Sequence, residues 1–184
     1  MNQGDEMFTI TTRGLDDAIS KLKNADTGKL QRALRSAVLR TLRGAKKEAG
    51  TRVKQRYTAN AGLVTRTIQI KAAGLSGSMT SSGGKNPLPK FIVRPRSRPR
   101  IMPAGGVFAM NVRGQGGQIT HAFLQKSGNV YERTGASRFP IRHLKGPSAP
   151  GMLGNPHVAP FIVRKMEQRI GIEIEHAAAA LGFF

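Results

Sequence analysis

The 184-residue sequence contains no cysteine, which excludes disulfide bonds and thiolate metal sites and fits work in a reducing cytosol. Tryptophan is also absent and aromatic residues make up only 5% of the chain. This scarcity argues against reading single-stranded nucleic acid by stacking bases on aromatic side chains. No run of about 18 apolar residues occurs, so no membrane span is expected. The polar, acidic segment Met1–Ile10 has no apolar core of signal-peptide length.

Acidic residues are scarce as well. The chain has ten of them against thirty lysines and arginines, which gives a formal net charge of +20 and a pI near 11.6. Between Glu48 and Glu132 there is no acid at all, while basic residues continue throughout. A chain with this balance attracts polyanions, so the expected partners are nucleic acid, an anionic membrane surface or acidic proteins. Hydrophobic residues, at 39%, are sufficient for a folded core.

The groups that carry catalysis are few and scattered. The acids are confined to the two ends of the chain, which disfavours a pair of cooperating carboxylates. Gly114, Gly116 and Gly117 are not followed by the lysine–serine or lysine–threonine pair of a phosphate-binding loop, so a hairpin turn is the preferred interpretation. We therefore predict no catalysis, no cofactor and no metal site. None of the four histidines forms the helical pair that zinc hydrolases use: His121, His143, His157 and His176.

The longest regular pattern runs from Gly28 to Tyr57. Apolar side chains recur there three or four residues apart and draw one stripe along a helix, with Thr27 as the predicted N-cap. Basic residues occupy the side of the helix opposite this stripe. A charged helix face is commonly just solvated, but Glu48 is the single acid in the stretch, and this favours a specific partner for the basic face. The stripe consists of Leu30, Leu34, Val38, Leu42, Ala45, Ala49 and Val53. The basic face consists of Arg32, Arg35, Arg40, Arg43, Lys46 and Lys47.

The remaining pattern predicts an α+β fold, with the long helix packed on a mainly antiparallel sheet of about four or five strands. A C-terminal helix over 160–181 carries its own apolar stripe, and a short helix opens at Asp16. The whole chain, 1–184, is predicted to form a single domain. Strands are predicted over 7–11, 68–70, 91–93, 107–112, 119–125 and 130–131, with a glycine-rich turn at 114–117 and a loop over 83–89.

Two segments combine basic residues with proline and glycine. The first, Arg94–Pro103, is predicted to be an extended arm, because its prolines forbid a helix or a central strand. Its arginines either clamp phosphate or an acidic neighbour, or form a solvated edge that prevents aggregation. The second, Thr134–Pro156, is a long loop of the kind that is often functional, and here a protein interface is favoured over DNA. The predicted contact residues are Arg94, Arg96, Arg98, Arg100, Arg138, Arg142, His143 and Lys145.

The segment between Gly106 and Leu153 holds a distinctive order of motifs, in which a hydrophobic–proline–isoleucine step precedes a glycine–proline–serine turn. Its residues are Phe123, Gly128, Val130, Arg133, Gly135, Arg138, Phe139, Pro140, Ile141, Arg142, Lys145, Gly146, Pro147, Ser148, Pro150, Met152 and Leu153. Together with the long helix, Leu63–Ile70 and Pro87–Phe91, this order resembles the minor tail protein Z family of long-tailed bacteriophages and their prophages. The resemblance covers residues 28–181, and Phe139 stands where an aliphatic residue is familiar.

This resemblance implies a non-enzymatic structural protein of the virion. Family members complete the tail at its head-proximal end, the neck, where the tail joins the filled head. The resemblance also implies a homo-oligomeric ring, sixfold like the tail, around or beside the DNA channel, assembled in the cytoplasm of the host bacterium. Its expected partners are further copies of the chain, the tail terminator, the tail tube or other neck proteins, and duplex DNA bound without sequence preference.

Composition alone leaves an alternative open, which is a free, basic nucleic-acid-binding protein without sequence preference. A nuclease ranks third, because it would need a metal site that the sequence does not assemble.

Overall fold

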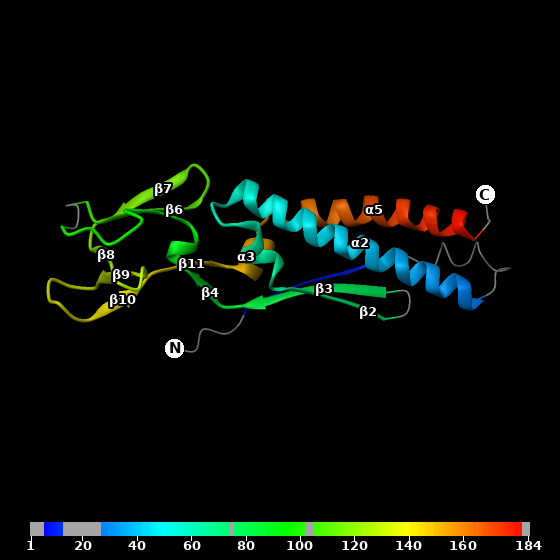
Figure 1. Cartoon of the computed structure of the whole chain (residues 1–184), viewed down its shortest axis with the longest axis horizontal. Helices are drawn as coiled ribbons and strands as arrows, with labels where there is room; N and C mark the ends of the chain where they lie inside the picture. The colour runs from blue at the N-terminus through cyan, green and yellow to red at the C-terminus, as the bar shows by residue number, and fades with distance from the viewer. Residues whose placement is uncertain (1–5, 13–26, 74–75, 102–104, 182–184) are drawn as a thin grey trace.

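The structure of the chain is a computed structural model that describes residues 6–12, 27–73, 76–101 and 105–181. The described part is elongated, with two long helices at one end and a group of short strands at the other (Figure 1). A long helix, several antiparallel sheets and a C-terminal helix confirm the predicted α+β class. The short helix predicted at Asp16 lies outside the described residues.

Helix α2 (Thr27–Arg56) is the central element of the helical end. Its 30 residues make it about 45 Å long at 1.5 Å per residue. The predicted apolar stripe faces the main hydrophobic core, and none of its side chains is more than 5% exposed. The bounds differ from the prediction by one residue at each end. Thr27 is the first helical residue and not the N-cap, and Tyr57 leaves the helix to form an isolated bridge with Val112.

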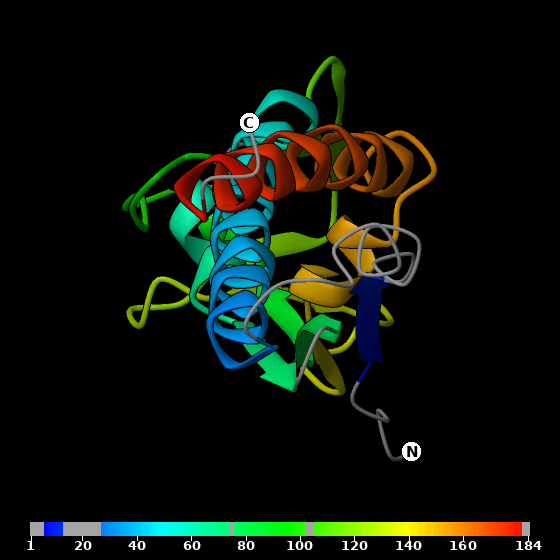
Figure 2. The same cartoon turned by 90° about the vertical axis from the view of Figure 1, so that its right-hand side faces the viewer.

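Helix α2 lies between a second helix and a sheet (Figure 2). The second helix, α5 (Ala159–Ala180), confirms the predicted C-terminal helix and buries Ile162 and Met166 against the core that it shares with α2. The side chain of Arg169 crosses α2 at Gly44, where a Cβ atom would lie only 2.5 Å from its Nε. The absence of a side chain at Gly44 therefore lets the two helices approach each other closely.

The sheet on the opposite side of α2 has three antiparallel strands with β3 in the centre. Gly77 of β3 approaches α2 so closely that a Cβ atom there would lie 2.6 Å from methyl carbons of Val38 and Leu42. Such contact explains why a strand rich in serine and glycine, with weak alternation, occupies the middle of the sheet. The strands are β1 (Glu6–Thr12), β2 (Ile68–Ala73) and β3 (Ser76–Gly83).

Two short helices complete this core. Helix α3 (Ala61–Thr65) leads from α2 into β2, and the side chain of Asn60 caps it by accepting a hydrogen bond from the Gly62 amide. Helix α4 (Ala149–Leu153) buries Met152 and Leu153 completely.

Residues 85–148 form a second part of the molecule, which we call the β lobe, with a smaller hydrophobic core of its own. Three small antiparallel sheets build it, in the orders β5–β6–β7, β8–β9–β10 and β4–β11. Its core side chains are Leu88, Val93, Val107, Ala122, Leu124 and Val130. Its elements are β4 (Lys85–Pro87), the 3-10 helix η1 (Leu88–Lys90), β5 (Ile92–Arg94), β6 (Val107–Val112), β7 (Gln115–Ile119), β8 (Ala122–Leu124), β9 (Val130–Arg133), β10 (Ile141–His143) and β11 (Lys145–Ser148).

The β lobe joins the helical end at the C-terminus of α2. The Thr58 amide donates to the Asn111 carbonyl at 2.9 Å, and the Arg113 amide donates to the Arg56 carbonyl at 2.9 Å. The side chain of Arg113 also donates through Nε to the Lys54 carbonyl at 2.8 Å. These bonds tie strand β6 to the last turn of the helix.

The prediction of a single sheet of four or five strands is wrong. The described strands are divided among four small sheets, because the helical end and the β lobe bury separate cores. The strand predicted over 119–125 is interrupted at Thr120 and His121, between β7 and β8. The predicted glycine turn is confirmed at Gly114, which lies between β6 and β7 with a φ of +77°, whereas Gly116 and Gly117 lie in β7. Phe108 packs across Gly116, where a Cβ atom would lie 2.4 Å from the ring.

The loops predicted over 83–89 and 134–156 contain regular structure. The first holds β4 and the start of η1, and the second holds β10, β11 and α4. Gly146 enters β11 because the backbone passes close to Phe91, and a Cβ atom there would lie 2.4 Å from the ring. Ser148 then caps α4 by accepting a hydrogen bond from the Gly151 amide at 3.0 Å. Close packing and a cap thus order a segment whose composition predicts a loop.

Candidate cation-rich interface

The β lobe is the most strongly charged part of the molecule. Residues 85–148 contain twelve lysines and arginines and one acid, Glu132. That acid is already engaged, because Arg142 donates to its carboxylate at 2.5 Å across the β9–β10 pair. The remaining cations of the β lobe have no carboxylate partner among the described residues. The lobe therefore presents an almost uncompensated positive surface.

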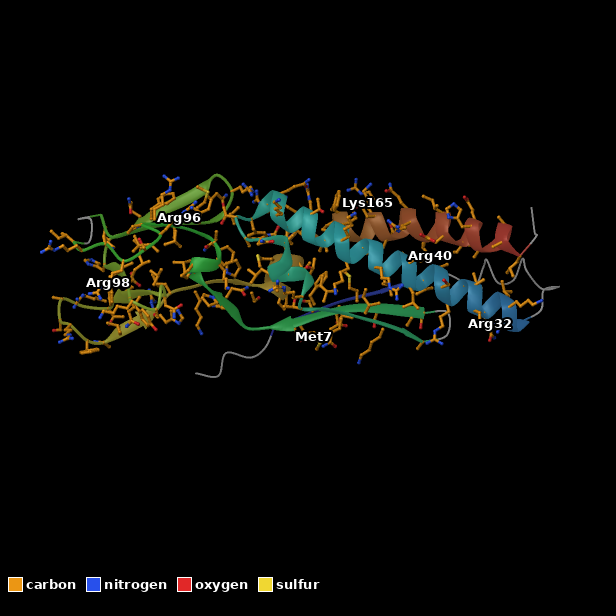
Figure 3. The ribbon with its side chains drawn as sticks, viewed as in Figure 1. Met7, Arg32, Arg40, Arg96, Arg98 and Lys165 are labelled. Carbon is orange, nitrogen blue, oxygen red and sulfur yellow. The ribbon has the colours of Figure 1, made fainter. Side chains whose placement is uncertain are left out.

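The predicted arm follows the β5 strand and lies on the surface of the β lobe. Arg94 is the last residue of β5 and pairs in register with Phe108 of β6. Residues 95–101 pair with no strand, as their prolines require. Figure 3 shows Arg96 and Arg98 on the β lobe, far from the labelled arginines of α2. The four exposed arginines of the arm are Arg94, Arg96, Arg98 and Arg100, and its residues 102–104 lie outside the described part.

A hollow of about 450 Å³ lies between the arm and the hairpin that joins β8 to β9. Arg98 from the arm, Lys126 from the hairpin and Arg133 from β9 supply three positive charges to its walls. The guanidinium carbon of Arg133 lies 5.4 Å from the centre of the Phe123 ring, which is a cation–π contact. The lining is completed by Phe123, Leu124, Gln125 and Ser127. Of these residues, the sequence predicts only Arg98 as a contact residue. Lys126 lies between the predicted strands 119–125 and 130–131 and Arg133 follows them, and nothing in the pattern brings either residue near the arm.

A row of three rings crosses the β8–β9–β10 sheet beside this hollow. The ring of Tyr131 lies 6.3 Å from that of Phe123 and 4.8 Å from that of His143, measured between centroids. His143 is half-buried in this row, and its Nε2 is buried with no hydrogen-bond partner. The structure thus gives His143 a packing role, whereas the sequence predicts a contact with a partner.

The other predicted contacts of the second segment differ in what they can do. Arg138 is exposed and its guanidinium carbon lies 5.7 Å from the centre of the Phe139 ring. Lys145 in β11 is also exposed. Arg142 is largely neutralised by Glu132. Arg138 and Lys145 therefore remain free to meet an anionic partner.

The predicted basic face of α2 divides into two groups. Arg40 pairs with Glu173 of α5, with Nε 2.6 Å from Oε2. The Lys46 ammonium donates to the Ile68 carbonyl at 2.9 Å and so ties α2 to β2. These two side chains hold the fold together. The side chain of Arg40 is nevertheless 47% exposed. The other exposed members of the face are Arg32, Arg35, Arg43 and Lys47.

The described residues assemble few groups that catalysis could use. No group of three or more histidine, aspartate or glutamate residues in them could hold a metal ion. No helix in the described part is long and apolar enough to cross a membrane.

One tyrosine has an altered titration: burial raises the pKa of Tyr57 above its ordinary value of 10.0, against the opposing effects of the Asn155 side chain and the Arg56 charge. Tyr57 lies at the junction of α2 and β6, where it forms a bridge with Val112, so the raised pKa follows from packing at this junction.

Comparison of the chain with family models, with curated proteins and with solved structures finds no match. The functional interpretation therefore depends on the residues and geometry described above.

Proposed function

We propose that this chain is a non-enzymatic structural protein of a bacteriophage tail. It acts at the head-proximal end, the neck, in tail completion and head–tail joining, as a sixfold ring around the DNA channel. The resemblance of residues 28–181 to the minor tail protein Z family motivates this proposal. The observation that carries it is the uncompensated charge of the β lobe, where twelve lysines and arginines meet one acid that is already paired.

Charge of this density favours a contact surface over a solvated edge. A few lysines are enough to keep an edge strand from pairing with another chain. Twelve like charges in 64 residues repel one another, and an anionic neighbour relieves that repulsion. Acidic neck or tube subunits and the DNA in the channel are neighbours of this kind.

Exposed apolar side chains on the β lobe support contacts with other proteins. Ile101 is 83% exposed next to Arg100, and Phe139 is 63% exposed next to Arg138. Aromatic residues and arginine are enriched at protein interfaces, where they dominate the binding energy. Each of these apolar side chains stands beside an arginine on an exposed segment, as expected of a residue that anchors a neighbouring subunit.

Particle assembly tests the proposal. In a phage or prophage that carries this gene, the double variant Arg96→Glu, Arg100→Glu reverses two exposed arm charges. We expect it to abolish infectious particles and to remove the chain from purified tails, as measured by plaque titre and mass spectrometry. The matched control Lys71→Glu, Arg164→Glu reverses two exposed charges at the helical end and should leave both readouts near wild type.

Three results would overturn the proposal. The first is a normal yield of infectious particles from the arm variant. The second is the absence of the wild-type chain from purified tails together with tight, salt-dependent binding of its monomer to DNA, which favours the free nucleic-acid-binding protein. The third is metal-dependent cleavage of a nucleic acid by the purified chain, which makes it an enzyme.

A further inference from the structure

Backbone hydrogen bonds hold the β8–β9 turn that forms one wall of the hollow. The Gln125 amide donates to the Asn129 carbonyl at 2.9 Å, and the Gly128 amide donates to the Gln125 carbonyl at 3.0 Å. Gly128 has a φ of +81°, a conformation that favours glycine. These features hold Lys126 and Ser127 at the tip of a tight turn, and Arg98 reaches the same hollow from the arm.

The guanidinium group of Arg133 is oriented before any ligand arrives. It lies over the Phe123 ring, 5.4 Å from the ring centre, and this cation–π contact favours that position of the side chain. The N–H donors of a guanidinium lie in its plane, where they match the spacing of oxygen atoms in a phosphate or a carboxylate. Less conformational entropy is therefore lost when an anion binds.

No carboxylate in the described part of the chain compensates this cluster. Arg98, Lys126 and Arg133 form no ion pair among the described residues. Three cations around one hollow of about 450 Å³ raise the local positive potential. An oxyanion is the ligand that this arrangement would attract and hold.

We propose that the hollow is a subsite for a backbone phosphate of duplex DNA. This inference rests on the proposed function, in which the ring surrounds the DNA channel. The donor set of arginine, lysine, serine and glutamine is the set that contacts phosphate in protein–DNA interfaces. Further exposed cations on the same lobe, Arg96, Arg100 and Arg138, suit a polyanion that continues beyond the hollow.

The aromatic row favours duplex over single-stranded nucleic acid. Binding of single strands uses open aromatic faces on which bases stack. Here the Phe123 ring carries the Arg133 guanidinium, and the Tyr131 ring is stacked with those of Phe123 and His143. The rings therefore hold a cation and pack the sheet. The hollow would bind the phosphate by its charge and would not recognise the bases.

Salt-dependent binding of the purified full chain to a short labelled duplex of mixed sequence tests the subsite. The hollow variant is Arg98→Gln, Lys126→Gln, Arg133→Gln. The matched control is Arg66→Gln, Lys71→Gln, Arg164→Gln, which removes the same charge from exposed positions of the helical end. We expect the slope of log affinity against log salt to fall by about one for the hollow variant, which loses one phosphate contact, and to stay at the wild-type value for the control. Arg133→Lys, which keeps the charge and loses the fork, should weaken binding by a smaller factor than Arg133→Gln.

Three results would overturn this inference. Equal losses in the hollow and control variants would show that only the overall charge matters. Tighter binding of a single strand than of the duplex, abolished by Phe123→Leu, would assign the site to base stacking. Displacement of the duplex by poly-L-glutamate of equal charge, with a loss confined to the hollow variant, would assign it to an acidic protein.

The same measurement separates this inference from the neck proposal. Equal DNA binding by both variants, combined with failed assembly of the Arg96→Glu, Arg100→Glu particles, rejects the subsite alone. DNA binding that depends on the hollow, combined with absence of the chain from tails, rejects the neck role alone.

Discussion

The guanidinium of Arg40 on α2 and the carboxylate of Glu173 on α5 lie 2.6 Å apart and join the two helices, although the two residues are 133 positions apart in sequence. Glu173 is only 8% exposed, and Arg169 approaches its other oxygen at 3.7 Å. The carboxylate is thus held between two cations of opposing helices. This buried acid gives Arg40 a structural role although about half of the Arg40 side chain is exposed.

Removal of Arg40 should destabilise the fold more than neutralisation of Glu173. Arg40→Ala leaves a buried carboxylate with one distant cation, which costs about 1–3 kcal/mol of unfolding free energy. Glu173→Gln removes the buried charge and keeps a hydrogen-bond acceptor for Arg40. Because the Arg40 side chain is half exposed and water can solvate it, this variant should lose about 1 kcal/mol of unfolding free energy or less. Urea denaturation measures both, with Arg35→Ala as an exposed control on the same helix. Equal losses for the first two variants would show that the two groups are not coupled in this way.

Alanine should have opposite effects at two close-packed glycines. At Gly44 the new methyl group meets the flexible end of Arg169, which can move aside, and alanine favours the helix by about 1 kcal/mol. At Gly77 it meets Val38 and Leu42 in the core, where overpacking costs about 1–3 kcal/mol. We expect Gly44→Ala to be neutral or stabilising and Gly77→Ala to lower the thermal midpoint. The reverse order would mean that the contact of β3 with α2 is not tightly packed.

Stability should depend on Tyr57 at high pH. Burial raises the pKa of Tyr57 above 10.0 in the folded state, so the unfolded chain releases this proton first. The unfolded state then binds fewer protons, and the unfolding free energy falls as pH rises through this range. Wild type should lose more stability than Tyr57→Phe between neutral pH and about pH 11. Denaturation curves of the two proteins at both pH values measure the difference, and parallel losses would contradict it.

Phe139 should contribute to self-association without contributing to the fold. It is 63% exposed, so Phe139→Ser removes little buried area from the monomer. Sedimentation velocity should show loss of the ring for Phe139→Ser and no change for Ile172→Ser, an exposed control on α5. Thermal midpoints of both variants should match wild type. An unchanged ring in the Phe139→Ser protein would exclude this side chain from the subunit contact.

The elements with long periodic patterns were predictable from sequence, and the β lobe was not. The stripe from Leu30 to Val53 and that of α5 each bury one face over many turns, so tertiary packing agrees with local periodicity. The strands of the β lobe are three to six residues long, and glycines enter them at Gly116 and Gly146 because rings pack across the backbone. Those contacts are made by Phe108 and Phe91, which periodicity does not relate to the glycines.

The candidate contact residues were predictable as a class and not individually. Composition indicates that most cations have no acidic partner, and the exposure of the arm arginines is consistent with this. It does not indicate which cations meet an internal partner, because Arg40, Lys46 and Arg142 find theirs through the tertiary fold. The hollow depends on a turn between β8 and β9 that only the pairing of the strands defines.

The hydrogen bonds of Thr58 and Arg113 fasten the β lobe to the tip of α2. A mechanical load applied to the lobe by a neighbour is therefore transmitted along the axis of this helix into the layer of side chains that it shares with α5. The helix is a rigid connection of about 45 Å. Its length sets the distance between the β lobe and the far end of the helical part, and its rigidity resists bending between them. In a ring of such subunits, the reach of each lobe would set the bore of the ring.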